Sequence, residues 1–505
     1  MNVWRTALSE RVRNNGTSIA LVEDQVHLTW NEISQFIDEL STTPISLQHP
    51  VILAGQRNYQ IILLMVSALA NDIVGLNLEK SLIASTLPRL TAQLPIHHLV
   101  VHEADLDRYA ELFRRLQYDL GPALVLDAFT PDKILGRPAV ISRLAQAHEQ
   151  ENEQLPVDCG WLLMTSGSTA DPKLVMVDRS DLVGRAHSEV REFSITPSDR
   201  ILNVLPVSHD VGFNQILSWL NSGCTLLVQG NSSQKQLRKN LAEGRVTGVS
   251  GTPLMWSGFV RGLASTEKFE AVRYITISGG IMPKPERMKL KDVFPRADFY
   301  RTYGQTETFR SLIQKNDLET DTHGSPPEGV RLRIIDDGGR ELSDAKEGQL
   351  VHSGVGTMLG YLDHVLKKRE VYTGDYFVRT ENGQFKYLGR RDDLIKRWEV
   401  RMYLSEVEDT LLKMNNVLNA CVLSRPVSDN RQHELAAFVV HRDSGTMPIE
   451  QMEETIKLAC SEALPASKIP DEIFVLSELP KTQSQKVDRV ALRKIWESKN
   501  ANSER

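Results

Sequence analysis

The sequence predicts an α/β fold with a large N-terminal domain of layered sheets and helices, a small β-barrel-like unit and a small α+β C-terminal domain. Up to residue 277, short apolar runs alternate with helical patterns, which is typical of buried and mostly parallel sheets. From residue 328 the chain shows short alternating strands with glycine turns, and after residue 389 helices and strands follow in α+β order. We therefore expect two domains, 1–389 and 390–505.

Each element is expected from its hydrophobic period. In the first part of the chain, helices are expected at 10–13 and 30–40, and strands at 51–54, 99–101, 123–126, 160–164, 201–205, 225–228, 249–251 and 274–277. The barrel-like unit is expected to contain strands 330–335, 349–352 and 385–388. The C-terminal domain is expected to contain helices 404–414 and 451–462 and strands 418–423 and 436–441, followed by a polar tail at 497–505.

Composition excludes several classes of function. The 505 residues carry a net charge of −6 with mixed signs and no basic stripe, which argues against a nucleic-acid partner. The four cysteines lie far apart without CxxC spacing, which argues against a disulfide scaffold or a zinc site. The N-terminus has no apolar signal region and no run of eighteen apolar residues occurs, so no membrane span is expected. We expect a soluble, cytoplasmic protein.

One loop carries most of the functional information. Residues 164–175 read Met-Thr-Ser-Gly-Ser-Thr-Ala-Asp-Pro-Lys-Leu-Val and follow an apolar strand. Hydroxyls, free backbone N–H groups and one ammonium in a small space are what a polyphosphate needs, although the Gly-Lys-Ser/Thr ending of a Walker loop is missing. The run resembles the phosphate loop T-S-G-S-T-G-x-P-K-G-V of the adenylate-forming superfamily, which includes acyl-CoA ligases, peptide-synthetase adenylation domains and luciferases. Ala170 and Leu174 replace two of its glycines.

Further motifs of this superfamily follow in the same order. They are Ser-Gly-Gly at 278–280, Tyr-Gly-Gln-Thr-Glu at 303–307, Gly-Gln-Leu at 348–350 with Gly-Tyr at 360–361, Tyr-Thr-Gly-Asp at 372–375, Gly-Arg-Arg-Asp-Asp-Leu-Ile-Lys at 389–396, and Pro-Lys-Thr with Lys-Val-Asp-Arg between 480 and 489. The resemblance spans roughly residues 29 to 493 and is strongest to stand-alone ligases that load amino acids onto carrier proteins.

The resemblance implies a role for each matched residue. The phosphates of ATP would be held by Thr165, Ser166, Gly167, Ser168, Thr169 and Lys173. The nucleoside would be held by Gly279 and Gly280 beside the adenine, Tyr303 stacked on it, and Asp375 and Arg390 at the ribose. The catalytic residues would be Thr306 at the α-phosphate, Glu307 as the Mg²⁺ ligand, a hard carboxylate for a hard cation, and Lys486 as the transition-state cation.

The resemblance also implies that the C-terminal domain is mobile about Asp392, closing with Lys486 for adenylation and rotating for thioester formation. Two residues depart from the family pattern here. Gln485 stands where the family usually has glycine before the catalytic lysine, and Glu399 stands where a glycine usually lets a pantetheine arm pass close to the backbone.

The acyl site is expected in the run 205–215, with Asp210 and Gly212 as binding residues. This run resembles S-F-D-Y-G-L-N-Q of stand-alone amino-acid-activating ligases, in which the aspartate holds the substrate ammonium. It also resembles H-D-M-G-L of fatty-acyl-AMP ligases, and a helix-capping aspartate is a third interpretation. The substrate-binding set is completed by Thr302, Arg310 and Ser311, and Arg310 would pair with Asp210 or bind a substrate anion.

These patterns predict an ATP- and Mg²⁺-dependent ligase that adenylates a small carboxylic acid, specifically a small amino acid, and transfers it to the phosphopantetheine thiol of a separate carrier protein. Two alternatives remain open. The first is an acyl-CoA ligase for a fatty or aryl acid, with CoA as the acceptor. The second is a non-catalytic nucleotide-binding homologue, which the replaced glycines favour and the intact Lys173, Glu307, Asp375 and Lys486 oppose.

Overall fold

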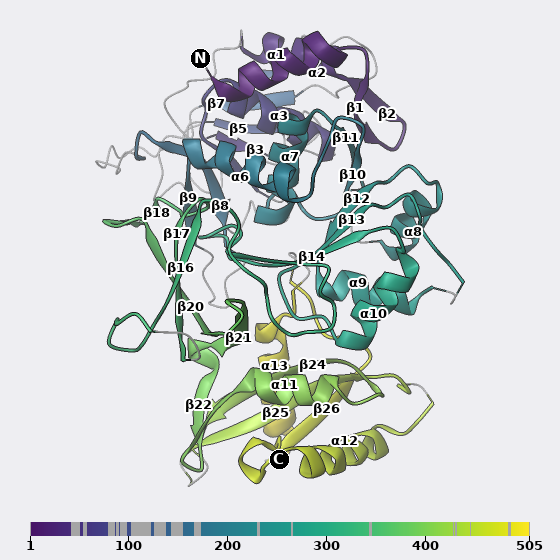
Figure 1. Ribbon diagram of the computed structural model, residues 1–505, viewed down its shortest axis with the longest axis vertical. Coiled ribbons are helices and arrows are strands. Elements are labelled where there is room, and N and C mark those ends of the chain that lie inside the picture. The colour runs from purple at the N-terminus through teal and green to yellow at the C-terminus, as the bar shows by residue number, and fades with distance from the viewer. Residues whose placement is uncertain are drawn as a thin grey trace.

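The computed structural model describes residues 2–41, 51–53, 58–78, 86, 90, 98–102, 123–125, 138–142, 155–165, 173–229, 233–263, 266–342, 346–427, 429, 432–444, 446–482 and 486–503. Two large sheets with their helices form the upper part of the molecule in Figure 1, and a smaller α+β unit lies below them. Within the described ranges, every helix is too short or too polar to cross a lipid bilayer.

The first large sheet has eight strands in the order β15-β14-β13-β12-β10-β11-β1-β2. Their bounds are β1 Ile19–Glu23, β2 Val26–Thr29, β10 Arg200–Asn203, β11 Thr225–Val228, β12 Gly248–Gly251, β13 Tyr274–Ser278, β14 Asp298–Tyr303 and β15 Leu312–Lys315. Only the edge strands β2 and β15 pair antiparallel. The prediction of buried, mostly parallel strands is thereby confirmed, although β10 ends two residues earlier than expected.

The second large sheet has nine strands in the order β19-β18-β9-β8-β4-β3-β5-β7-β6. Their bounds are β3 Val51–Leu53, β4 Gly75–Asn77, β5 His98–His102, β6 Ala123–Val125, β7 Pro138–Ser142, β8 Cys159–Met164, β9 Leu174–Asp178, β18 Gly360–Tyr361 and β19 His364–Val365. Strands β8 and β9 pair antiparallel on either side of the predicted phosphate loop. This pairing fixes both ends of that loop on the sheet.

Helix α7, Asp210–Ser222, packs against strands of both sheets. Its Phe213 stacks on Trp161 of β8 at 5.2 Å between ring centroids, while its Trp219 stacks on Trp30 at 5.0 Å and donates to the carbonyl of Ala20 in β1. A helix that is apolar around most of its circumference is stable only when buried. The other helices of this part are α1 Val3–Asn15, α2 Trp30–Ser41, α3 Asn58–Ala70, α6 Arg179–Glu192, α8 Gln234–Ala242, α9 Pro253–Arg261 and α10 Lys284–Val293.

The short alternating strands form a four-stranded antiparallel sheet in the order β16-β17-β20-β21. Their bounds are β16 Val330–Ile335, β17 Glu347–Gly354, β20 Glu370–Arg379 and β21 Phe385–Arg390. The sequence anticipated three of these strands. It missed β20, which runs through the Tyr-Thr-Gly-Asp motif at 372–375.

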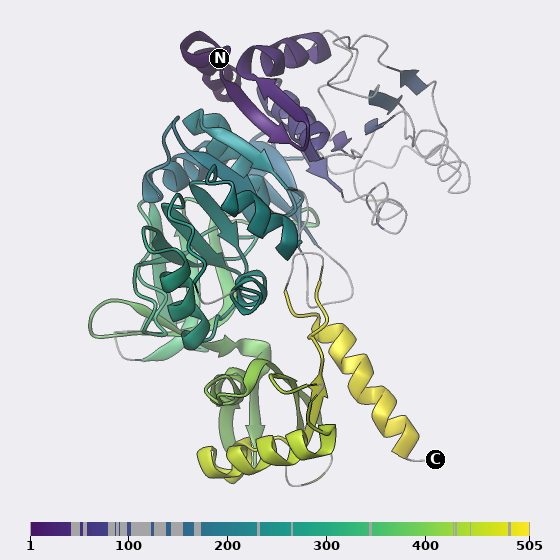
Figure 2. The same ribbon diagram turned by 90° about the vertical axis from the view of Figure 1, so that its right-hand side faces the viewer.

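The remaining residues form the smaller α+β unit. Its elements are η2 Arg391–Asp393, β22 Leu394–Arg397, β23 Val400–Tyr403, α11 Leu404–Leu412, β24 Val417–Pro426, β25 His433–His441, α12 Ile449–Ala463, η3 Ala466–Lys468, β26 Glu472–Leu476 and α13 Arg489–Ser503. The polar segment expected at 497–505 belongs to α13 as far as residue 503, and this helix buries Leu492 and Trp496 in the core of the unit before that segment begins. Figure 2 shows the segment before α13 reaching up toward the larger part.

Candidate active site

Asp375 lies at the centre of the predicted nucleotide site. Its Oδ2 atom accepts hydrogen bonds from the Tyr303 hydroxyl at 2.6 Å and from the Gln305 side chain at 2.8 Å. Arg390 is its direct partner across β20 and β21, with Nε 3.4 Å from Oδ1. Burial raises the pKa of Asp375, and the Tyr303 and Arg390 contacts offset part of that rise. The structure therefore brings Tyr303, Asp375 and Arg390 together as predicted.

The ring of Tyr303 is packed within an aromatic group. Phe377 meets it edge-on at 4.8 Å between centroids, His323 meets it edge-on at 6.2 Å, and Tyr387 lies tilted at 6.4 Å. Its hydroxyl is fixed by Asp375, so the ring has one orientation. Stacking on adenine remains a prediction for this ring.

Glu307 and Lys173 meet through Tyr361. The Tyr361 hydroxyl donates to Oε1 of Glu307 at 2.8 Å, and the Lys173 ammonium lies 4.6 Å from the Tyr361 ring centroid. Burial and the Glu307 carboxylate raise the pKa of Tyr361, which keeps its hydroxyl a donor. Thr306 precedes Glu307 in the same half-buried turn.

The ends of the phosphate loop are hydrogen-bonded to each other. The backbone N–H of Thr165 donates to the carbonyl of Lys173 at 2.9 Å, and the N–H of Lys173 donates to the Thr165 hydroxyl at 3.0 Å. Four predicted phosphate ligands lie outside the described residues: Ser166, Gly167, Ser168 and Thr169.

The donor set fits a magnesium ion that arrives with a nucleotide. Across the described ranges, no three His, Cys, Asp or Glu side chains are grouped as an all-protein metal cage. Magnesium in nucleotide sites typically takes one or two carboxylates, with phosphates and waters completing the shell. Glu307 supplies such a carboxylate, within reach of the same tyrosine that contacts Lys173.

Lys486 of the smaller unit lies against Gly279 of the larger one. Gly279 has a φ of +87°, and a Cβ atom built there would be 3.2 Å from the Lys486 Cε atom. The lysine sits in a short hairpin, because the N–H of Thr482 donates to its carbonyl at 2.8 Å. Gly280 has room for a methyl group, 3.5 Å from Pro253. The predicted catalytic lysine and adenine loop are thus side by side.

The predicted hinge residue, Asp392, is exposed in the 3₁₀ turn η2 that follows β21. Its neighbour Asp393 accepts hydrogen bonds from Arg489 at 2.9 and 3.0 Å. The hinge role of Asp392 stays a prediction.

Asp210 is the first residue of α7, and its half-buried carboxylate accepts from the N–H of Val211 at 2.8 Å. It therefore also serves the helix N-terminus, where negative charge is favoured. A glycine is required at position 212 for steric reasons, because a Cβ atom there would lie 2.2 Å from the carbonyl oxygen of Pro206. The absence of a side chain lets α7 approach the loop that precedes it.

Arg310 has a partner that the sequence did not suggest. Its guanidinium is buried, 3.6 Å from Oε2 of Glu189 in α6, and lies 4.8 Å from the ring centroid of Phe193 and 4.9 Å from that of Phe309. The ion pair of Arg310 is therefore with Glu189 rather than with Asp210, and binding of a substrate anion by Arg310 stays a prediction.

The other two predicted substrate residues are buried in hydroxyl contacts. Thr302 lies 2.6 Å from the Ser278 hydroxyl. The Ser311 hydroxyl lies 3.0 Å from Nδ1 of His352, whose Nε2 donates to the carbonyl of Val355 at 3.0 Å.

Comparison with known proteins agrees with this geometry. Residues 8–362 match the AMP-binding enzyme family, and residues 406–486 match the AMP-binding enzyme C-terminal domain. The chain belongs to the AMP-binding enzyme family. It is therefore an ATP-dependent, AMP-forming ligase by family, and its fold is that of the adenylate-forming enzymes.

Two curated relatives are similar over two thirds of the chain. A D-alanine–D-alanyl carrier protein ligase of Listeria monocytogenes is 28% identical over 358 residues, covering 66% of this chain and 69% of the relative. The non-ribosomal peptide synthetase CmlP of Streptomyces venezuelae is 29% identical over 348 residues, also 66% of this chain, but the match spans only 34% of that longer protein.

Solved AMP-binding enzymes share the fold over nearly the whole chain. An ATP-bound RpMatB–BxBclM chimera superposes with a TM-score of 0.82 at 19% identity, covering 98% of this chain and 99% of the chimera. An o-succinylbenzoate coenzyme A synthetase from Bacillus subtilis, in complex with ATP and magnesium ion, superposes with a TM-score of 0.76 at 20% identity, covering 96% and 99%.

Sequence reasoning missed several polar residues at this site. Gln305 and Tyr361 stand inside matched motifs, but they were given no role. Asp181, Arg185 and Glu189 recur every fourth residue in α6 and are all buried. These three charged residues lie on one face of the helix, among residues that face the core. That spacing in the sequence could have indicated them.

His352 makes the site sensitive to acid. Burial and nearby Arg185 lower its pKa from 6.5 to about 4, and His323 is lowered to about 4 by burial and Arg301. A depressed histidine pKa contributes stability that is present above pH 6.5 and lost as pH falls through 4. Each histidine should contribute roughly 3 kcal/mol at most.

We expect the free energy of unfolding, measured by urea titration, to fall between pH 6.5 and 4. His352→Gln should remove part of that fall and not all of it, because burial also lowers the pKa of His209, His323 and His433. His364→Gln, at an exposed residue of β19, is the control and should leave the profile unchanged. An identical pH profile in wild type and His352→Gln would contradict the assignment.

Proposed function

We propose that the protein activates a small amino acid as its adenylate, releasing pyrophosphate from ATP, and then transfers the aminoacyl group to the phosphopantetheine thiol of a separate carrier protein. One observation carries the first half of the proposal. Lys486 lies against Gly279, where a cation for adenylation would be needed, and Asp375 and Glu307 each have a side-chain hydrogen bond.

In this proposal each described residue has a chemical task. Asp375 accepts hydrogen bonds from the ribose hydroxyls, with Arg390 beside it. Glu307 binds Mg²⁺, which neutralises phosphate charge. Lys173 and Lys486 provide positive charge for the phosphates and the transition state, and Thr306 donates to the α-phosphate.

The substrate and acceptor are supported by similarity and by charge. Two D-alanine–D-alanyl carrier protein ligases of Listeria are among the relatives, and the match spans 69% and 76% of their lengths. An amino acid needs an anion for its ammonium group, and Asp210 presents a half-buried carboxylate at the start of α7. A CoA thiol is the competing acceptor, and the assays below separate the two.

The direct test is the half-reaction. With ATP, Mg²⁺ and the right acid, the protein should exchange labelled pyrophosphate into ATP, and hydroxylamine should trap the acyl group. A panel of amino, fatty and aryl acids identifies the substrate, and CoA and carrier protein are then offered as acceptors. No exchange with any acid would leave only the non-catalytic homologue.

Lys486→Ala should keep ATP binding but lose adenylation by at least about a hundredfold, the usual scale for one preorganised transition-state contact. Thioester formation from supplied acyl-adenylate should suffer much less, because the lysine would have rotated away. Lys481→Ala, in the same hairpin and paired with Glu478, is the matched control. Equal losses in both half-reactions would refute the two-state domain movement.

Asp210→Asn separates the substrate classes, because it keeps the shape of the side chain and removes its charge. An ammonium left without its anion should weaken transition-state binding of the amino acid by roughly 3–5 kcal/mol, measured as kcat/KM. The matching deamino acid should lose little. If both acids respond alike, or if the wild type prefers the deamino acid, the acyl-CoA ligase reading replaces the amino-acid one.

A further inference from the structure

We infer that Asp181 and Arg185 of α6 are positioning residues for the metal ligand Glu307, acting through the turn at residues 354–358. The inference rests on the proposed function, because it takes Glu307 as the Mg²⁺ ligand. Neither α6 residue matches a motif of the family in the sequence, and neither contacts Glu307 directly. Their effect is transmitted by the backbone of one residue, Gly356.

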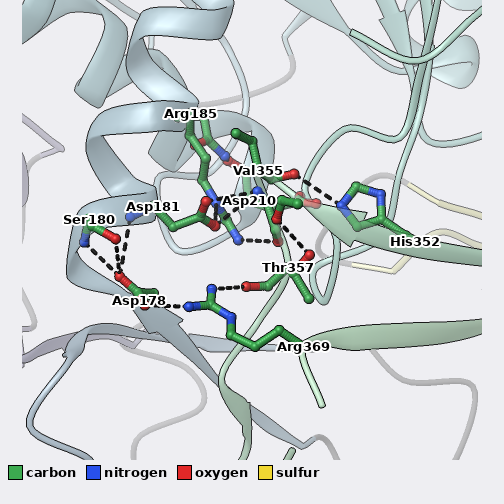
Figure 3. A network of polar contacts seen from close by, with 12 residues as sticks. Asp178, Ser180, Asp181, Arg185, Asp210, His352, Val355, Thr357 and Arg369 are labelled. Carbon is green, nitrogen blue, oxygen red and sulfur yellow. Dashed lines mark hydrogen bonds and ion pairs between the residues drawn. The ribbon is translucent and has the colours of Figure 1, made fainter. Parts of the chain in front are cut away.

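Side chains of α6 hold both backbone polar groups of Gly356, on the two successive peptide groups that meet at this residue. The N–H of Gly356 donates to both carboxylate oxygens of Asp181, at 2.9 and 3.0 Å, and the Gly356 carbonyl accepts from Nη2 of Arg185 at 2.9 Å. Arg185 Nε lies 3.4 Å from Asp181 Oδ2, so the two side chains also hold each other. Figure 3 shows this group between α6 and the turn.

Residues 354–358 pack closely against the backbone of the loop that carries Glu307. Gly356 has a φ of +93°, and a Cβ there would lie 2.3 Å from the carbonyl oxygen of Thr308. The N–H of Met358 donates to the carbonyl of Glu307 itself at 3.0 Å. The chain then continues into β18, where Tyr361 holds the Glu307 carboxylate. Both the backbone and the side chain of Glu307 are therefore fixed by the segment that α6 clamps.

Two neighbouring contacts strengthen the same turn. Arg369 bridges Asp178, at the N-terminus of α6, to the carbonyl of Thr357, with distances of 2.5 and 2.7 Å. His352 donates to the carbonyl of Val355 from the strand that leads into the turn. Figure 3 draws these residues around Arg185.

The burial of this pair favours a positioning role over a purely stabilising one. Arg185 is fully buried and Asp181 nearly so. A buried ion pair costs desolvation and is often no more stabilising than well-packed apolar residues, and its best-attested use is to specify one geometry. Arg185 also lies close enough to Asp210 for that carboxylate to raise the pKa of the guanidinium against the lowering by burial. One side chain thus borders both the acyl residue and the turn behind Glu307.

The test compares Asp181→Asn with Asp199→Asn. Asp199 is an equally buried aspartate that pairs with Arg273 at 2.6 Å, between β10 and β13 and away from the turn. Both variants should lose thermal stability. Only Asp181→Asn should raise the Mg²⁺ concentration that half-saturates pyrophosphate exchange, by about tenfold or more, as loss of a residue that orients a metal ligand typically does.

A binding measurement keeps the inference separate from the proposed function. Calorimetry with α,β-methylene ATP, which cannot release pyrophosphate, reports the Mg²⁺ dependence of nucleotide binding without turnover. The same shift is expected for Asp181→Asn, with nucleotide binding in the absence of Mg²⁺ unchanged. If wild type shows Mg²⁺-dependent binding but no exchange with any acid, the proposed function fails while this arm still decides the inference.

Arg185 supplies a second pair of variants in case Asp181→Asn fails to fold. Arg185→Lys keeps the charge and one donor, whereas Arg185→Met keeps only the length. The Mg²⁺ requirement should rise more in Arg185→Met than in Arg185→Lys. Equal Mg²⁺ requirements in Asp181→Asn, Asp199→Asn and wild type, or in the two Arg185 variants and wild type, would reduce the pair to a structural role and overturn the inference.

Discussion

The site depends on the close packing of backbone segments around the loop from Tyr303 to Phe309. At two glycines of these segments there is no space for a side chain. A Cβ on Gly304 would lie 1.8 Å from the carbonyl oxygen of Phe309, and one on Gly356 would lie 2.3 Å from that of Thr308. Phe309 is held at a φ of +59°, and its N–H donates to Gln305 at 2.7 Å. Such a conformation costs energy in a residue other than glycine and persists only where its surroundings enforce it.

Three ion pairs lie around this loop. Arg185 faces Asp181, Arg310 faces Glu189 and Arg390 faces Asp375. Each pair joins segments distant in sequence or successive turns of α6, and each is at least partly buried. Because a buried charge is tolerated only with a partner, the position of every group constrains its neighbours. The two guanidiniums of Arg185 and Arg310 also share the Phe309 ring, at 5.2 and 4.9 Å.

The sequence predicted the layered sheets because parallel strands leave continuous apolar runs, and it predicted Tyr303, Asp375 and Arg390 as neighbours because the motifs name them. It could not predict that α13 continues past residue 497, since the decisive contact is burial of Trp496 against a distant sheet. It left Arg310 to pair with Asp210 or to bind a substrate anion, because the Glu189 contact forms only once α6 packs against the loop that precedes β15. In the sequence, the only sign that charged residues of a helix are buried by tertiary packing is their recurrence every fourth residue, as in α6.

The effect of Glu399, which replaces a family glycine, also could not be predicted without the backbone conformation at this position. Trp398 and Glu399 join β22 to β23 with φ of 48° and 67°, a two-residue turn that usually takes asparagine and glycine. The chain therefore keeps the left-handed backbone that glycine would supply, at the energetic cost of two side chains in that region. Lys396 forms an ion pair with Glu399, and Arg397 lies 4.9 Å from the Trp398 ring centroid. The substitution thus preserves the path of the backbone and changes what it presents, a paired carboxylate beside an exposed indole.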